Sequence, residues 1–86
     1  MIEQLEQDIA RGNRAQILLK DDLLNGAFDR LKAEYLKKWE AANSRDVEGR
    51  ERLWWAVRVV NEVRSDLANM VQNGTLARVE LEQQDK

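Results

Sequence analysis

Residues 46–72 decide the fold, and they read DVEGRERLWWAVRVVNEVRSDLANMVQ. An apolar stripe runs through this stretch in steps of three and four residues, comprising Leu53, Ala56, Val60, Val63, Leu67 and Met70. Because an α-helix turns by about 100° per residue, side chains at this spacing share one face. Ser44 or Asp46 can cap the exposed N–H groups of the first turn. The pattern therefore predicts a long helix over residues 46–72.

A second stretch, residues 21–42, reads DDLLNGAFDRLKAEYLKKWEAA and predicts a helix just before the first. Its apolar residues follow a near-heptad spacing and comprise Leu24, Phe28, Leu31, Tyr35, Trp39 and Ala42. Asp21 or Asp22 can cap this helix. Gly26 either marks a close contact with another helix or weakens its own helix, by about 1 kcal/mol relative to alanine.

The two predicted helices are joined only by residues 43–45, and so short a connection favours antiparallel neighbours. In such a hairpin the two apolar stripes match, and Tyr35 is expected to lie opposite Leu53. The second helix is longer than the first. We therefore expect its last apolar residues, Leu67, Met70 and Val71, to lie beside residues 17–19.

The two ends of the chain predict shorter helices. A narrow stripe of Ile2, Leu5 and Ile9 indicates a helix from Ile2 to about Arg11, interrupted at Gly12, that either folds back or projects as an arm. Asn73-Gly74 is expected to end the long helix, with Gly74 left-handed and Thr75 capping a short C-terminal helix. The fold class is therefore all-α: a single helical domain over 1–86, with an N-terminal helix or arm (1–19), a long antiparallel hairpin (21–73) and a C-terminal helix or tail (75–86).

The composition excludes many chemistries. The chain has 14 Lys+Arg, 16 Asp+Glu and a net charge of -2, and it lacks proline, cysteine and histidine. It therefore has no disulfide, no thiolate or imidazole metal ligand and no Ser-His-Asp triad. Glu62 and Asp66 are one helical turn apart, but two carboxylates are too few for a metal site built from oxygen ligands. We expect no enzyme, no catalytic residues, no cofactor and no metal.

Membrane contact is not expected either. The apolar runs are far shorter than the roughly 20 residues that cross a bilayer. The first residues, Met1-Ile2-Glu3-Gln4-Leu5-Glu6, are acidic and unlike a secretory signal.

Arginines on the long helix raise the alternative of nucleic-acid binding. Arg50, Arg58 and Arg64 fall within a limited arc of the helical wheel, with Asn61 between them, so they can form a strip that follows phosphates. Acidic residues are interleaved on the same helix, and the protein is net acidic. We therefore favour a solvated face with ion pairs over a nucleic-acid interface.

The tryptophans give a sharper signal. Trp39 fits the seam of the hairpin, but Trp54 and Trp55 fall on opposite edges of the long helix's stripe, and a two-helix seam cannot bury both. Either the N-terminal helix covers one of them and the other lies at the surface, or they form a protein interface, where tryptophan and arginine are favoured anchors. A hairpin this small favours a homo-oligomer or a larger assembly. The predicted interface residues are Trp54, Trp55, Arg50, Arg58, Ile2, Leu5 and Ile9.

One set of residues also suggests a family. It comprises Leu23-Leu24, Ala27-Phe28-Asp29, Tyr35-Leu36, Trp39, SRDVEGRERLW at 44–54, Ala56-Val57, Val59-Val60 and Gly74. This set resembles small, mostly uncharacterised helical proteins of tailed bacteriophages and proteobacterial prophages, often encoded near head and packaging genes. The resemblance covers about half of the chain, and the run RDVEGRERLW is its most specific part.

The resemblance implies a structural role in virion morphogenesis or packaging. It places the protein in the virion or in the cytoplasm of a bacterial host, as a homo-oligomer or within a larger phage assembly. The alternative is a nucleic-acid-binding module, such as a small DNA-packaging recognition subunit. No catalytic motif accompanies the family.

Overall fold

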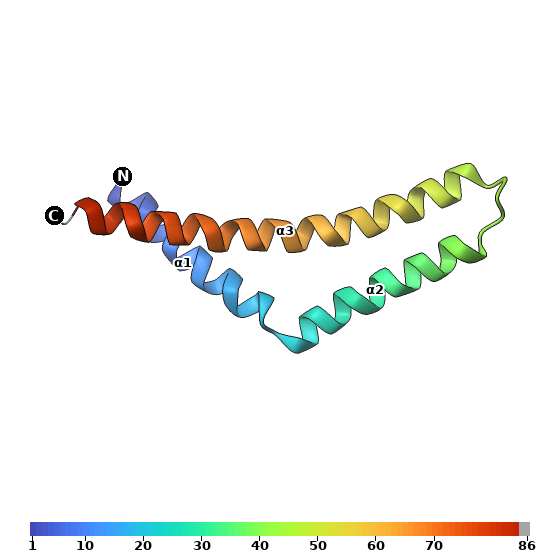
Figure 1. Cartoon of the computed structure of the whole chain (residues 1–86), viewed down its shortest axis with the longest axis horizontal. Helices are drawn as coiled ribbons and strands as arrows, with labels where there is room; N and C mark the ends of the chain where they lie inside the picture. Colours follow the sequence, from blue (N-terminus) through green and yellow to red (C-terminus); the bar gives the residue numbers. More distant parts are fainter. Residues whose placement is uncertain (85–86) are drawn as a thin grey trace. The chain divides into compact units, whose positions relative to one another are not determined.

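The computed structural model describes residues 1–84, and these residues form three α-helices (Figure 1). They are α1 (Ile2–Leu19), α2 (Asp22–Ala41) and α3 (Val47–Gln84). No strand occurs between residues 1 and 84, so the prediction of an all-α fold is confirmed. The predicted helix over residues 21–42 corresponds closely to α2.

The chain divides into two compact units. The terminal unit contains residues 1–21 and the part of α3 from Arg64 onward, and the middle unit contains residues 22–63. Helix α3 contributes its second part to the terminal unit and its first part to the middle unit.

Small residues bring two helix backbones together in the terminal unit. Gly12 and Ala15 of α1 are buried, and so are Gly74 and Ala77 of α3. A Cβ atom built on Gly12 would lie 2.9 Å from the carbonyl oxygen of Met70 and 3.0 Å from the Cα of Gly74. These distances are too short for any side chain. The two helices therefore pack backbone against backbone, and we call this contact the glycine crossing.

The expected helix ends at both glycines are wrong. Helix α1 continues through Gly12 to Leu19, and α3 continues through Gly74 to Gln84. No glycine in the described residues has positive φ, so Gly74 is not in the left-handed conformation. The hydroxyl of Thr75 donates a hydrogen bond within the helix to the carbonyl of Val71 (3.1 Å) and does not cap a new one. Close packing at the crossing offsets the low helix propensity of glycine.

The N-terminal helix folds back onto α3 within the same chain. Besides the glycine crossing, the guanidinium of Arg78 donates a hydrogen bond to the side-chain oxygen of Asn13. Leu18 lines the same surface hollow as Leu67 and Met70. The predicted proximity of residues 17–19 to the last apolar residues of the long stripe is therefore confirmed for Leu18.

The middle unit is packed much less tightly. Within α2, all of which the structure describes, no residue is buried. In the whole range 22–63 the single buried residue is Val60. A Cβ on Gly26 would meet only the guanidinium of Arg30, on its own helix, at 3.2 Å. Gly26 therefore marks a weak position of α2, and not a close contact with another helix.

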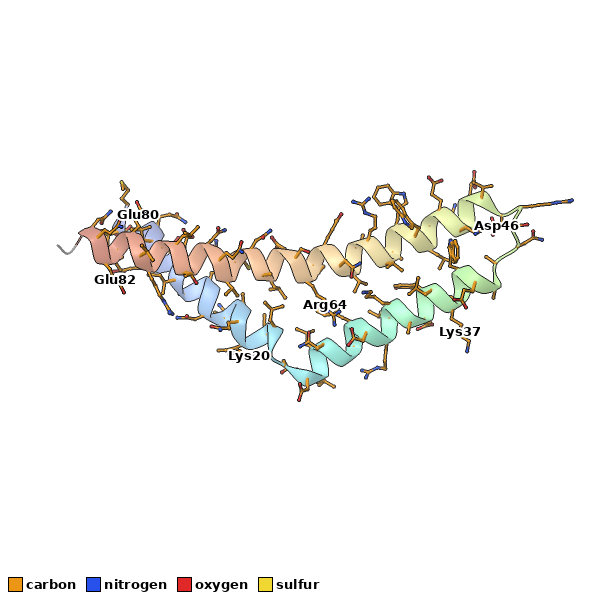
Figure 2. The ribbon with its side chains drawn as sticks, viewed as in Figure 1. Lys20, Lys37, Asp46, Arg64, Glu80 and Glu82 are labelled. Atoms are coloured by element: carbon orange, nitrogen blue, oxygen red, sulfur yellow. The ribbon has the colours of Figure 1, made fainter. Side chains whose placement is uncertain are left out.

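A capping carboxylate fixes the start of α3. Asp46 directly precedes the helix (Figure 2), and its Oδ1 accepts a hydrogen bond from the backbone N–H of Gly49 at 3.0 Å. Of the two predicted caps, Asp46 is therefore the one used. The preceding connection is ordered by a similar bond, in which the N–H of Arg45 donates to Oδ1 of Asn43 at 2.9 Å.

Candidate protein interaction surface

Two neighbouring tryptophans dominate the exposed side of the middle unit. Trp54 is 49% exposed and Trp55 is 51% exposed. Their ring centroids are 5.1 Å apart and their planes meet at 75°, which is the favoured edge-to-face arrangement of aromatic pairs. The guanidinium carbon of Arg58 lies 5.0 Å from the ring centroid of Trp54 and 5.3 Å from that of Trp55. We call these three residues the tryptophan surface.

Contacts within the tryptophan surface restrain its side chains before any partner arrives. Each exposed cation–π contact is worth about 0.5–1 kcal/mol. A terminal nitrogen of Arg58 also lies 3.9 Å from a carboxylate oxygen of Glu62, one helical turn further on. Because binding costs less when side chains are already ordered, this arrangement favours use of the surface as an interface.

The structure adds a contact between the two tryptophans that the helical wheel does not give. On a helical wheel, Trp54 and Trp55 lie on opposite edges of the stripe, yet their rings touch in the structure because the long side chains lean towards each other. The alternative in which one of them is covered is not met, since about half of each side chain is exposed. Of the two readings, exposure therefore favours the interface.

Arg50 does not join the tryptophan surface. Its guanidinium carbon lies 4.5 Å from the ring centroid of Trp39 on α2, and the residue is half-buried. Trp39 keeps 39% of its surface exposed, so it lies at the margin of the seam and not in a core. The arginine strip considered for nucleic acid is divided in the same way, because Arg50 and Arg58 stack on different aromatic rings.

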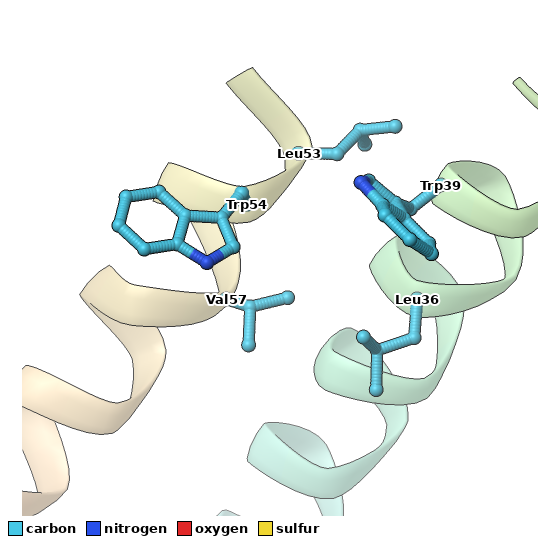
Figure 3. Close-up of a pocket in the computed structure, with 5 residues that line it drawn as sticks. All are labelled: Leu36, Trp39, Leu53, Trp54 and Val57. Atoms are coloured by element: carbon cyan, nitrogen blue, oxygen red, sulfur yellow. The ribbon is translucent and has the colours of Figure 1, made fainter. Parts of the chain in front are cut away.

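An apolar hollow adjoins the tryptophan surface. Its volume is about 210 Å³, and its walls are Leu36, Trp39, Leu53, Trp54 and Val57. Figure 3 shows Leu53 and Val57 of α3 pointing towards Leu36 and Trp39 of α2, while the indole of Trp54 lies along the other side of α3. Small-molecule pockets typically occupy about 300–1,000 Å³, so the hollow is closer in size to one large side chain.

Leu36 was not among the predicted interface residues, because it falls outside the heptad stripe of α2. A signal was nevertheless present in the sequence. Leu36 and Trp39 are three residues apart, which places them side by side on one helix face.

Charges of both signs surround Trp55. Glu48, Glu51 and Arg52 line a second, shallower hollow beside it. With the Arg58–Glu62 pair, the charged groups named on this part of α3 are three carboxylates and two guanidiniums. Such a mixed pattern lacks the single-sign field that guides nucleic acid to a protein.

The second predicted interface stripe is largely used inside the chain. Leu5 is buried in the terminal unit with 8% of its surface exposed, and Ile9 is half-buried. Only Ile2, at 52% exposed, remains available to a partner. The expectation of an exposed stripe therefore does not hold for Leu5, because α1 packs against α3 of its own chain.

A metal-binding cluster and a membrane-spanning helix are both absent from the described residues. Within residues 1–84, no group of three or more carboxylates is placed to hold a metal ion. In the same range, every helix is too polar or too short in its apolar stretches to traverse a bilayer. Comparison with known proteins finds no matching family model, no matching curated protein and no matching solved structure.

Proposed function

We propose that this chain is a non-enzymatic assembly protein that acts through helix-mediated association with another protein. The observation that carries the proposal is the half-exposed Trp54–Trp55 pair, held together by Arg58. Tryptophan and arginine are the residues most often found at the energetic centres of protein interfaces.

The scarcity of buried residues in the middle unit supports the proposal. With Val60 as its single buried residue, residues 22–63 have little core of their own. In the proposal, α2 and the first part of α3 act as an antiparallel hairpin whose exposed apolar side is completed by a partner. Exposed aromatic and apolar surface of this kind commonly marks an interaction site.

The biological setting in the proposal is virion morphogenesis or packaging in a bacterial host. It rests on the resemblance of residues 23–67 to the phage-encoded helical proteins. The nucleic-acid alternative lacks a supporting observation of its own, because the arginines stack on separate aromatic rings amid acidic neighbours.

The test replaces Trp54 with alanine in a tagged chain. Wild-type and Trp54→Ala chains are used as baits against a second, differently tagged copy and against a bacterial lysate, and helicity is followed by circular dichroism. We expect the variant to keep its helicity and to lose complexes that the wild type forms. Val59→Ala, which truncates another exposed side chain on the same helix, is the matched control and should keep them.

Two results would contradict the proposal. One is a folded Trp54→Ala chain that retains every complex of the wild type. The other is a variant that loses its helicity, because Trp54 would then be a core residue.

A further inference from the structure

We infer that Asn43 is a site of spontaneous modification in the folded chain, where attack by the following backbone nitrogen converts it to aspartate and isoaspartate. In an unfolded chain the most reactive sites would be Asn25 and Asn73, because each is followed by glycine, which is small and has a flexible backbone. Asn43 is followed by the bulkier Ser44. In the folded chain we expect the opposite order. The site shares no residue with the tryptophan surface, and its reaction does not depend on the proposed function.

The reaction at Asn43 needs only the chain and water. The backbone nitrogen of Ser44 loses its proton to a solvent base and attacks Cγ of Asn43. A carbon–nitrogen bond forms at Cγ, the bond from Cγ to Nδ2 breaks, and ammonia leaves after taking up a proton. Water then opens the resulting succinimide ring at either of its carbonyl carbons, which gives aspartate or isoaspartate. The attacking nitrogen must therefore be free to ionise and able to approach the side chain.

Helical structure restrains both Asn-Gly pairs. Asn25 lies in α2 and Asn73 lies in α3, and within an α-helix each backbone N–H donates to the carbonyl four residues earlier. Ring closure also requires the backbone to rotate out of the helical conformation. At Asn73 the glycine crossing opposes this rotation as well. A Cβ atom on the next residue, Gly74, would lie 3.1 Å from both the carbonyl oxygen of Asp8 and the Cα of Gly12.

Asn43 is under neither restraint. Among the asparagines of the chain, all of which the structure describes, it alone lies outside a helix. Asn43 and Ser44 are both exposed, and within residues 1–84 no hydrogen-bond acceptor is placed for the N–H of Ser44. Oδ1 of Asn43 accepts a hydrogen bond from the N–H of Arg45 at 2.9 Å. Because negative charge develops on this oxygen during the attack, the same donor stabilises the transition state.

The modification would change the connection between α2 and α3. At present the backbone carbonyl of Asn43 accepts a hydrogen bond from the N–H of Asp46, the residue that caps α3, at 2.9 Å. In isoaspartate the main chain runs through the side-chain carbons, so this carbonyl becomes a free carboxylate and the connection gains a carbon atom. We therefore expect the first turn of α3 to loosen as the chain ages.

The experiment follows the modification by tryptic peptide mapping with mass spectrometry. The full chain is incubated at mildly alkaline pH, either folded in buffer or unfolded in urea, and then digested. Trypsin places the three asparagines in separate peptides, which are residues 21–30, 39–45 and 65–78. In the folded chain we expect Asn43 to be converted first, at least about tenfold faster than Asn73, whose reaction requires local opening of a packed helix. In urea we expect Asn25 and Asn73 to overtake Asn43.

Two variants test the proposed chemistry. Ser44→Val hinders the attacking nitrogen, and Asn43→Gln would have to close a less favourable six-membered ring, so each should suppress modification at this position. Ser65→Val, at a serine of α3 that does not follow an asparagine, is the matched control and should leave the rate at Asn43 unchanged. Circular dichroism reports whether each variant keeps its helices. Slower conversion of Asn43 than of Asn25 or Asn73 in the folded wild type overturns the inference, and so does an unchanged rate at Asn43 in Ser44→Val.

Discussion

The terminal and middle units use the same helix, α3, in opposite ways. In the terminal unit, α3 presents glycine and alanine to α1, and the two backbones come so close that a Cβ on Gly12 would lie 2.9 Å from a backbone oxygen. In the middle unit, α3 presents valine, leucine and tryptophan, and a hollow of about 210 Å³ remains between its side chains and those of α2. The glycine crossing brings the two backbones into contact, whereas the contact between α2 and α3 leaves a hollow between large side chains.

The two contacts differ in residue size, and the contact made by the small residues is the closer one. Small residues allow backbone contact, and beside Gly12 and Gly74 only about 20 Å³ of space remains. Between α2 and α3, large side chains pack incompletely and leave a hollow, while Trp54 and Trp55 stay half-exposed. Shape-complementary interfaces are built from such recesses and exposed side chains. Substitutions in both units test this comparison.

The largest effect is expected for Gly12→Leu in the terminal unit. Its side chain would have to displace the backbone of α3 at Met70 and Gly74, which is not a flexible neighbour. We expect a loss of about 3 kcal/mol in the free energy of unfolding, measured by urea titration with circular dichroism detection. Ala10→Leu, at an exposed position of the same helix, should change stability by no more than about 0.5 kcal/mol. Equal effects of the two substitutions would show that the glycine crossing is not a tight contact.

A smaller effect is expected for Asp46→Ala in the middle unit. The substitution removes the side-chain oxygen that accepts the N–H of Gly49, so the first turn of α3 should fray at a cost of about 1 kcal/mol. Amide hydrogen exchange should quicken over the first turn of α3, from Val47, and remain unchanged at the glycine crossing. Asp66→Ala, in the interior of the same helix, is the control. Unchanged exchange at the start of α3 would argue against the cap.

The smallest effect is expected for Gly26→Ala, and it has the opposite sign. The added methyl group meets only the guanidinium of Arg30, which can move aside, while the helix gains about 0.5–1 kcal/mol from the higher propensity of alanine. Thermal unfolding should therefore shift upward. A decrease in stability would mean that α2 has a close neighbour at this position, and the middle unit would then be more tightly packed than the comparison states.

The all-α fold class and the starts of the helices could be predicted, because both depend on local sequence signals. The stripe spacing identified α2 and most of α3, and Asp46 followed by Gly49 gave a usable cap. The ends of α1 and α3 could not be predicted in this way, because Gly12 and Gly74 are typical helix terminators when read alone. Each is followed three residues later by alanine, at Ala15 and Ala77, and that shared spacing was the missed sign of two helices in close contact.

The interaction surface was predictable only in part, for a similar reason. A helical wheel gives the direction of each Cα–Cβ bond, but the contact between Trp54 and Trp55 depends on the rotamers of two long side chains. The stacking of Arg50 on Trp39 depends on the register between α2 and α3. Neither property is contained in the periodicity of one segment.

The contact between Asn13 and Arg78 has a consequence for the order of folding, since these residues are 65 positions apart in the chain. Bringing such distant segments together closes a long loop, and contacts of this kind form slowly. Residues 22–63 are joined by a short connection and can assemble first. During synthesis, α1 is made well before its partner segment on α3, so the terminal unit closes only after residues 64–84 have also been made.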